Sequence, residues 1–154
     1  MLFKKSKKTT ILAPAKGTII SIDQIPDPVF SSKMMGDGFG IEITDGMIHA
    51  PVAGTIKTAF PTGHAYGIET KEGIEVLVHI GLDTVELNGD GFAVKVETGQ
   101  SVNVGDVLCV VDIEKVKQAG KSLVSPVIIT SGQSITNVQT GSVQAQDEVA
   151  IIQK

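Results

Sequence analysis

Apolar residues recur along the chain in short runs that are rich in Val, Ile and Thr and separated by Gly, Asp and Asn. Runs of this kind, divided by turn-forming residues, are typical of β-strands joined by tight turns. The alternation is clearest at Ile74, Val76, Val78 and Ile80, which mark the core-facing side of one strand. The pattern therefore predicts an all-β protein with little helix.

The second half of the chain also contains two short helical patterns. Residues 83–87 are expected to form one helical turn with Asp83 as its N-cap, and residues 113–119 a short helix that ends at Gly120. Further strands are predicted over residues 107–111, 123–130 and 149–152.

A short motif occurs twice. The sequence APAKGTI at residues 13–19 recurs as APVAGTI at residues 50–56, and residues 125–127 repeat its start. Proline fixes φ at the edge of a strand, and glycine permits a tight turn. The repeat therefore indicates a duplicated structural unit, which carries no chemistry of its own.

Two of the three histidines flank one predicted hairpin. His64 precedes the segment AYGIET, His79 ends the segment IEVLVH, and only Lys71, Glu72 and Gly73 are available as a turn. If Lys71 and Glu72 alone form the loop, the two histidines lie directly opposite each other, with Cβ atoms about 4.5–5.5 Å apart. A bulge at Gly73 shifts the pairing by one residue and sends the rings to opposite faces. We predict the first register, in which the two imidazoles meet.

The segment between the two repeats is apolar but irregular, because Pro26 and Pro28 exclude regular strand pairing. Composition favours burial of its apolar side chains in a short helical turn. The alternative is an exposed patch, in which flexible methionines suit the binding of several partners. The side chains concerned are Val29, Phe30, Met34 and Met35.

Length and charge narrow the class of protein. A chain of 154 residues with 42% hydrophobic content is enough for one domain with a sizeable core. The net charge of −4 and the lack of a recognition motif argue against nucleic-acid binding. All thirteen basic residues are lysines, so chemistry that needs a bidentate arginine must take the arginine from a partner.

The start of the chain and its single cysteine bear on location. Residues 1–10 are rich in lysine and are expected to be a flexible terminus with at most weak membrane contact, whereas residues 11–154 form the single domain. Cys109 rules out an internal disulfide, suits a reducing compartment and is expected to be a buried hydrophobe. No apolar run matches a membrane span or a signal peptide, so a cytoplasmic location is expected.

Two facing imidazoles admit three kinds of chemistry. A general base for a serine nucleophile needs a strained elbow such as GxSxG, which is missing. A catalytic zinc site would take His64, His79 and Asp83 as its three ligands. The third possibility is a phosphoryl group carried on an imidazole nitrogen, since a neutral imidazole is a good nucleophile near neutral pH. The remaining histidine, His49, is expected to be structural.

The segments around the two histidines resemble a known family. GHAYGIE at residues 63–69 and VLVHIGLDTVELNGDGF at residues 76–92 closely resemble the active-site segments of the glucose-family enzyme IIA proteins of the bacterial phosphoenolpyruvate-dependent sugar phosphotransferase system. The likeness extends from about Ile11 to the C-terminus, through IPDPVF, APVAGTI and TGQSVNVGD. Members fold as a compact antiparallel β-sandwich, so the resemblance implies this fold here.

The resemblance also implies a mechanism. Members accept phosphate from the phosphocarrier HPr and pass it to a cysteine of the IIB domain. His79 resembles the residue that is phosphorylated at Nε2, and His64 the neighbour that steadies the phosphoryl group. Thr62 resembles the hydroxyl that orients the second histidine, and the Gly81 carbonyl the acceptor that sets the tautomer of His79. No cofactor is implied, and a monomer is expected.

The family docks its partners through an apolar ring around the histidines, with rim carboxylates that meet basic residues on HPr. This implication reverses the preference for burying the segment between the repeats, and it supplies the missing arginine from the partner. The alternative is a zinc-dependent hydrolase, because the duplicated units also resemble those of certain zinc peptidases. The ring residues would be Val29, Phe30, Met34, Met35, Phe60 and Leu77, and the rim residues Asp27 and Asp83.

Overall fold

The computed structural model of the chain describes residues 9–153. Of the lysine-rich segment predicted over residues 1–10, only Thr9 and Thr10 fall in this range, and both belong to the first strand. The helical elements are η1 (Ile22–Gln24), α1 (Pro28–Ser31), η2 (Thr84–Leu87) and α2 (Ile113–Gln118). The strands are β1 (Thr9–Leu12), β2 (Gly17–Ser21), β3 (Asp37–Ile43), β4 (Met47–His49), β5 (Gly54–Ala59), β6 (Ala65–Glu69), β7 (Glu75–His79), β8 (Phe92–Val94), β9 (Ser101–Val102), β10 (Val107–Val111), β11 (Val124–Ile129), β12 (Ser134–Thr136), β13 (Gly141–Val143) and β14 (Glu148–Gln153).

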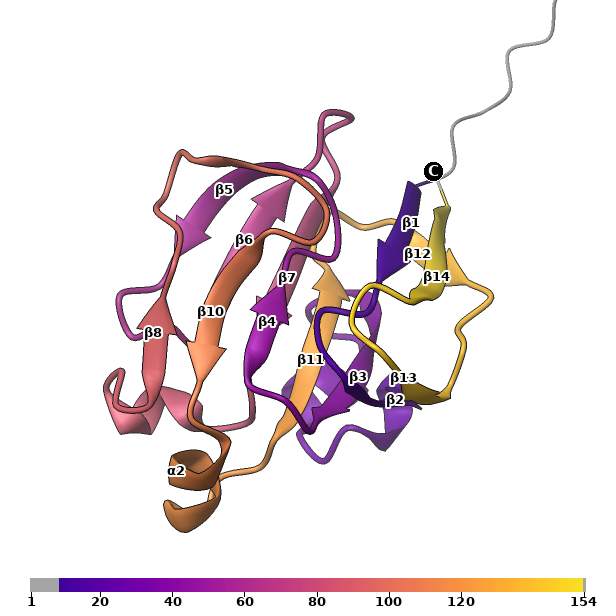
Figure 1. Ribbon diagram of the computed structural model, residues 1–154. Coiled ribbons are helices and arrows are strands. Elements are labelled where there is room, and N and C mark those ends of the chain that lie inside the picture. The colour runs from indigo at the N-terminus through magenta and orange to yellow at the C-terminus, as the bar shows by residue number, and fades with distance from the viewer. Residues whose placement is uncertain (1–8, 154) are drawn as a thin grey trace, which may run out of the picture.

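In this range the strands form antiparallel sheets of unequal size (Figure 1). The main sheet has eight strands in the order β13-β2-β3-β11-β7-β6-β5-β9, and two three-stranded sheets have the orders β4-β10-β8 and β1-β14-β12. In Figure 1 the β4-β10-β8 sheet lies in front of β5, β6 and β7. Side chains of both sheets belong to one buried cluster, so the sheets pack face to face. The predicted all-β sandwich is confirmed.

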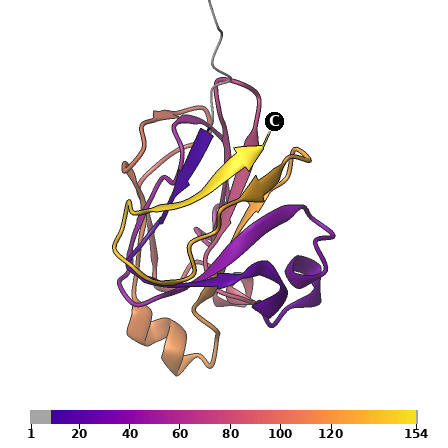
Figure 2. The same ribbon diagram turned by 90° about the vertical axis from the view of Figure 1, so that its right-hand side faces the viewer.

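Strands β7 and β11 lie at the centre of the main sheet, and β11 is buried along its whole length. Val76 and Val78 of β7 join the large cluster between the sheets. Leu77, on the opposite face of β7, packs against a smaller cluster that includes Phe30 of α1. Figure 2 shows the purple helical segment that carries α1 projecting from the side of the strands. Because residues two apart on a strand share a face, His79 lies on the same side as Leu77.

The two copies of the repeated motif exchange equivalent hydrogen bonds. Leu12 N–H donates to the Pro51 carbonyl at 3.0 Å, and His49 N–H, at the equivalent position of the second copy, donates to the Pro14 carbonyl at 2.6 Å. Each copy therefore satisfies backbone groups of the other, which confirms the predicted duplication of a structural unit.

A glycine starts the strand of each copy, Gly17 in β2 and Gly54 in β5. A Cβ atom at Gly17 would lie 2.2 Å from the Glu42 carbonyl oxygen, and one at Gly54 would lie 2.2 Å from the Glu69 carbonyl oxygen. The glycines of the repeat thus allow each strand to approach its neighbour closely.

The duplication extends further along the chain than the sequence motif indicates. Strand β13 pairs with β2 in the first copy, and β9 pairs with β5 in the second. After each of these partner strands, an aspartate accepts a backbone hydrogen bond at 2.8 Å: Asp147 Oδ2 from Gln144 N–H, and Asp106 Oδ2 from Asn103 N–H. This part of the duplication is hard to see in the sequence, because VQAQDEV and VNVGDVL share little beyond a valine and the aspartate.

Strands β3 and β6 hold equivalent places, because β3 pairs with β2 and β6 pairs with β5. Aligned on the glycine, isoleucine and glutamate that they share, DGFGIEI and HAYGIET place Asp37 at the position of His64. His79 pairs with Ala65 of β6, and the equivalent residue of β3 is Gly38. Gly38 pairs with Ile128, so an isoleucine stands at the position of His79. Only the second copy of the unit therefore carries the pair of imidazoles.

Candidate functional site

The two histidines lie at the ends of the β6–β7 hairpin, but the register of this hairpin differs from the predicted one. His79 pairs with Ala65, not with His64. Residues 71–73 form the loop, and Gly73 has a φ of 86°. A loop of this length that ends in a left-handed glycine is the bulged form of the hairpin. The prediction that the two histidines are directly opposed is therefore wrong.

The two imidazole rings still meet. Their centroids lie 5.2 Å apart, and the ring planes are inclined by 77°. His64 lies one residue before β6 and follows Gly63, whose φ is 73°. The alternation of faces along a strand does not extend to a residue outside it, so the shifted register does not separate the rings. The two rings therefore lie together as expected, although the strand register differs from the predicted one.

His79 is held in one tautomer. Its Nδ1 lies 2.8 Å from the carbonyl oxygen of Gly81. A carbonyl oxygen can only accept, so Nδ1 carries the proton and the lone pair of the neutral ring is on Nε2. The predicted relation between His79 and the Gly81 carbonyl is thus present in the structure.

The protonation of His79 reflects opposing influences. Burial, the largest of them, lowers the pKa of His79, whereas the hydrogen bond to Gly81 and the negative charges of Asp27 and Asp83 raise it. The net direction is below the ordinary value of about 6.5. His79 is therefore neutral, and nucleophilic at Nε2, at neutral pH.

His64 is less exposed to solvent than His79 and has its own orienting group. Only 4% of its surface is exposed, and burial, followed by the charge on His79, lowers its pKa. The Thr62 hydroxyl oxygen lies 2.6 Å from His64 Nδ1. When this hydroxyl donates to Nδ1, the neutral ring carries its proton on Nε2, where it can donate to a bound group.

Two phenylalanine rings complete a row of four aromatic rings. The Phe30 ring lies 5.2 Å from the His79 ring, and the Phe60 ring lies 5.2 Å from the His64 ring. Phe30 belongs to α1, and Phe60 follows β5. The helical segment between the repeats and the end of β5 thus flank the histidine pair from its two sides.

The apolar residues predicted to surround the site divide into exposed and buried members. Phe30 is 5% exposed, so it supports the His79 ring from within, and Leu77 is half-buried. Composition alone predicts burial of the apolar side chains in the segment between the repeats. That prediction is right for Phe30 and wrong for Val29, Met34 and Met35. The exposed members are Val29 (44%), Met34 (78%), Met35 (38%) and Phe60 (39%).

The two predicted rim carboxylates occupy different backbone settings. Asp27 is the N-cap of α1, and its Oδ1 accepts from Val29 N–H at 3.0 Å. Asp83 precedes η2 with a left-handed φ of 59°, but its side chain makes no capping hydrogen bond, so the predicted cap is correct in position only. Val85, in the same turn as Asp83, is an exposed apolar side chain with 50% of its surface accessible. The sequence assigns it no role, because it marks Val85 only as an apolar residue of a predicted helical turn.

The zinc alternative can be tested on the geometry. Within residues 9–153, no three His, Cys, Asp or Glu side chains lie close enough together to hold a metal ion. Asp83 therefore does not join His64 and His79 as a third ligand.

The other residues singled out in the sequence lie elsewhere. His49 Nδ1 donates to the Gly105 carbonyl at 2.8 Å, and Cys109 is fully buried in the core, in agreement with structural roles. Among the described residues, no helix is both long and apolar enough to cross a membrane.

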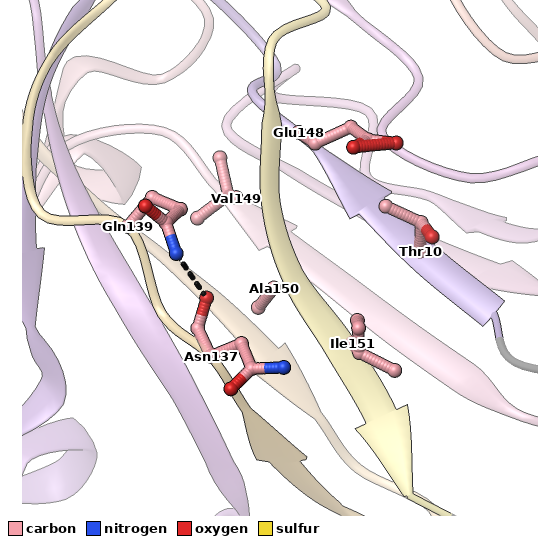
Figure 3. A pocket seen from close by; sticks show the side chains of 7 residues that line it. All are labelled: Thr10, Asn137, Gln139, Glu148, Val149, Ala150 and Ile151. Atoms are coloured by element: carbon pink, nitrogen blue, oxygen red, sulfur yellow. Dashed lines mark hydrogen bonds between the residues drawn. The ribbon is translucent and has the colours of Figure 1, made fainter.

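A separate hollow lies over β14 (Figure 3). Its polar side chains include Asn137, Gln139 and Glu148, which are exposed to solvent. Gln139 Nε2 donates to the Asn137 carbonyl at 3.0 Å, as Figure 3 shows. Neither His64 nor His79 lines this hollow.

Comparison with known proteins agrees with this geometry. Residues 9–135 match the family described as phosphoenolpyruvate-dependent sugar phosphotransferase system, EIIA 1. The chain is 48% identical over 149 residues to the glucose-specific EIIA component of the phosphotransferase system of Mycoplasma capricolum, covering 96% of this chain and 97% of that protein. It is 46% identical over 155 residues to the component of the same name in Staphylococcus aureus, covering 98% of this chain and 90% of that protein.

The fold has a solved counterpart as well. The structure of glucose permease IIA from Mycoplasma capricolum superposes with a TM-score of 0.92 at 47% sequence identity, covering 97% of this chain and 99% of that one. Identity at this level over nearly the whole chain reflects shared ancestry as well as a shared fold. The chain belongs to the EIIA 1 family of the phosphoenolpyruvate-dependent sugar phosphotransferase system.

Proposed function

We propose that the protein carries a phosphoryl group on His79 Nε2, which it accepts from phospho-HPr and donates to a cysteine of the IIB domain of a sugar permease. The observation that carries this proposal is the hydrogen bond of 2.8 Å between His79 Nδ1 and the Gly81 carbonyl. This bond keeps the ring proton on Nδ1 and leaves the Nε2 lone pair free beside a second imidazole.

The two transfers use the same nitrogen. In the first, the Nε2 lone pair attacks the phosphorus on HPr, and a new N–P bond forms as the bond to the HPr histidine breaks and its electron pair leaves with that ring. In the second, a cysteine thiolate of IIB attacks the phosphorus, and His79 leaves as a neutral ring with its proton still on Nδ1. Neither step requires ATP to bind, so the lack of arginine in the chain is no obstacle.

His64 would stabilise the transferring group. Its ring lies against that of His79, and the Thr62 hydroxyl, by donating to His64 Nδ1, would favour the tautomer in which Nε2 carries a proton. A hydrogen bond from this N–H to a phosphoryl oxygen would offset the charge that develops during transfer. Because burial lowers the pKa of His64, the ring would donate in its neutral form.

The surface around the histidines fits a protein partner better than a small substrate. Val29, Met34, Met35 and Phe60 are exposed apolar side chains, and Asp27 and Asp83 add negative charge near His79. A partner that presents apolar side chains together with arginine or lysine would match this surface in both respects. We expect the protein to act as a monomer in the cytoplasm, where its partners would be found. The relatives are named glucose-specific, which makes glucose the first sugar to test.

Reconstituted labelling tests the proposal. In the presence of phosphoenolpyruvate, enzyme I and HPr, the protein should take up one phosphate in an acid-labile, alkali-stable linkage, the behaviour of phosphohistidine. The variant His79→Ala should take up none. The variant His64→Ala should still be labelled but should fail to pass the phosphate to IIB.

His49→Ala is the matched control, because it removes the third histidine, whose Nδ1 is bonded to the Gly105 carbonyl in another part of the fold. It should be labelled and should donate normally. Normal labelling of His79→Ala would refute the assignment of the phosphorylated residue. Normal onward transfer by His64→Ala would refute only the role of His64.

A further inference from the structure

The carbonyl that orients His79 is itself held by the segment at the start of β11. Gly81 N–H donates to Ser125 Oγ at 3.0 Å, and Leu82 N–H donates to the Ser122 carbonyl at 3.2 Å. These two N–H groups lie on either side of the Gly81 α-carbon, so both backbone torsions of Gly81 are anchored, including its φ of 73°. The direction of the Gly81 carbonyl therefore depends on residues that are distant in sequence.

Ser125 makes the more specific of these two contacts, because it acts through a side chain. It is only 2% exposed, and its hydroxyl donates to the Leu123 carbonyl at 3.1 Å while accepting from Gly81 N–H. With the donor committed to Leu123, a lone pair of the oxygen is directed at Gly81. At this burial, water cannot readily replace the hydroxyl if it is removed.

Gly81 tolerates little movement. A Cβ atom at this position would lie 2.6 Å from Thr84 Cγ2 and 2.7 Å from the Ser122 carbonyl oxygen, so the turn packs tightly on both sides. Thr84 Oγ1 also donates to the Ile80 carbonyl at 2.5 Å and fixes the residue before the glycine. Within this packed turn, the Ser125 hydroxyl is the side-chain group that accepts from the Gly81 N–H.

We propose that Ser125 is a positioning residue for phosphoryl transfer: its hydroxyl orients Gly81 so that the Gly81 carbonyl keeps the His79 proton on Nδ1 and the lone pair on Nε2. The inference rests on the proposed function of His79. Ser125 does not touch the reacting nitrogen and acts through the backbone of Gly81, whose N–H it accepts from and whose carbonyl bonds His79. The chain of contacts runs from Leu123 through Ser125 and Gly81 to His79.

Nitrogen NMR of the His79 ring in the unphosphorylated protein, combined with the rate of labelling by phospho-HPr, tests this inference. In the natural protein the neutral ring should be protonated at Nδ1. In Ser125→Ala, and under reducing conditions in the nearly isosteric Ser125→Cys, which has a weaker acceptor, the ring should become a mixture of tautomers. Labelling of these variants should slow by about tenfold, the equivalent of one lost hydrogen bond of ordinary strength.

Two controls separate this role from a general loss of structure. Ser122→Ala removes a hydroxyl on the same segment that accepts from Val124 N–H and leaves the Ser122 carbonyl in place. This variant, and Ser125→Thr, which retains the hydroxyl, should both keep the Nδ1 tautomer and the natural rate of labelling.

The outcomes distinguish this inference from the proposed function. If the natural protein is labelled and Ser125→Ala or Ser125→Cys keeps both the tautomer and the rate, the positioning role is overturned while the proposed function stands. If the natural protein is not labelled, the proposed function fails, and the ring tautomer alone still decides whether Ser125 controls Gly81.

Discussion

The proton of His79 is controlled by groups that act in opposite directions. Burial lowers its pKa, while the Gly81 carbonyl and two carboxylates raise it. The net lowering means that the unfolded chain binds a proton at higher pH than the folded protein does. The contribution of His79 to the free energy of unfolding is therefore complete above about pH 6.5 and is lost as the pH falls through the folded pKa. The rate of labelling should likewise be constant at neutral pH and fall only on the acid side.

The first prediction concerns the charge on Asp83. Asp83→Asn should lower the pKa of His79 further, because it removes a negative charge that favours the protonated ring. Asparagine tolerates the left-handed φ of 59° at this position, so the backbone should be preserved. NMR titration of the ring measures the shift. Asp90→Asn, which removes a carboxylate paired with Lys115, is the control and should leave the titration unchanged.

The second prediction separates backbone strain from crowding at Gly81. Gly81 and Gly120 have nearly the same φ, 73° and 75°, but an added Cβ meets atoms at 2.6 and 2.7 Å at Gly81 and none within 4 Å at Gly120. Gly120→Ala should therefore cost only the strain of a left-handed alanine, about 1–2 kcal/mol in the free energy of unfolding. Gly81→Ala should cost more than that and should abolish labelling. Equal costs in denaturant titrations would show that crowding at Gly81 is unimportant.

At the scale of elements, the short helix α1 both positions an aromatic ring and carries a charge. Its N-cap Asp27 bonds Val29 N–H, its Phe30 lies against His79, and the charge of Asp27 raises the pKa of His79. The capping of α1 by Asp27 and the effect of its charge on His79 can be separated by substitution, because asparagine caps a helix as well as aspartate does but carries no charge.

The third prediction follows from this distinction. Asp27→Asn should leave the free energy of unfolding nearly unchanged but lower the pKa of His79. Asp27→Ala should have the same effect on the pKa and should also destabilise the protein by about 1 kcal/mol. Denaturant titration and NMR titration on the same samples measure the two effects. A similar loss of stability in both variants would mean that the charge, and not the cap, stabilises α1.

The elements differ in how far the sequence predicts them. The strand predicted over residues 107–111 and the helix ending at Gly120 agree with β10 and α2, because their patterns and end signals are local. The hairpin register was predicted wrongly because it depends on whether Gly73 belongs to the loop, which the apolar pattern on one strand does not decide. Ser125 could not be assigned a role from the sequence, since its contact with Gly81 spans 44 residues.

At the scale of the whole molecule, the duplicated unit makes a prediction about stability. Gly17→Ala and Gly54→Ala should each lower the free energy of unfolding by about 2–4 kcal/mol. The effects should be similar because each added Cβ would meet a carbonyl oxygen of the neighbouring strand at 2.2 Å. Gly67→Ala is the control, since its Cβ would have only one neighbour within 4 Å, Thr58 Cβ at 4.0 Å, and should change the free energy of unfolding little. Thermal unfolding measures all three. A mild effect at only one of the paired glycines would argue against equivalent roles.

The exchange of hydrogen bonds between the two copies has a consequence for how the chain holds together. Leu12 and His49 each donate across to the other copy, and the late strand β13 completes the sheet beside β2. A fragment that ended after the first copy would leave these backbone groups without partners and one sheet edge open. Neither copy is thus expected to fold by itself. The copy that carries His64 and His79 and the copy that lacks them should therefore unfold together on heating, in a single cooperative transition.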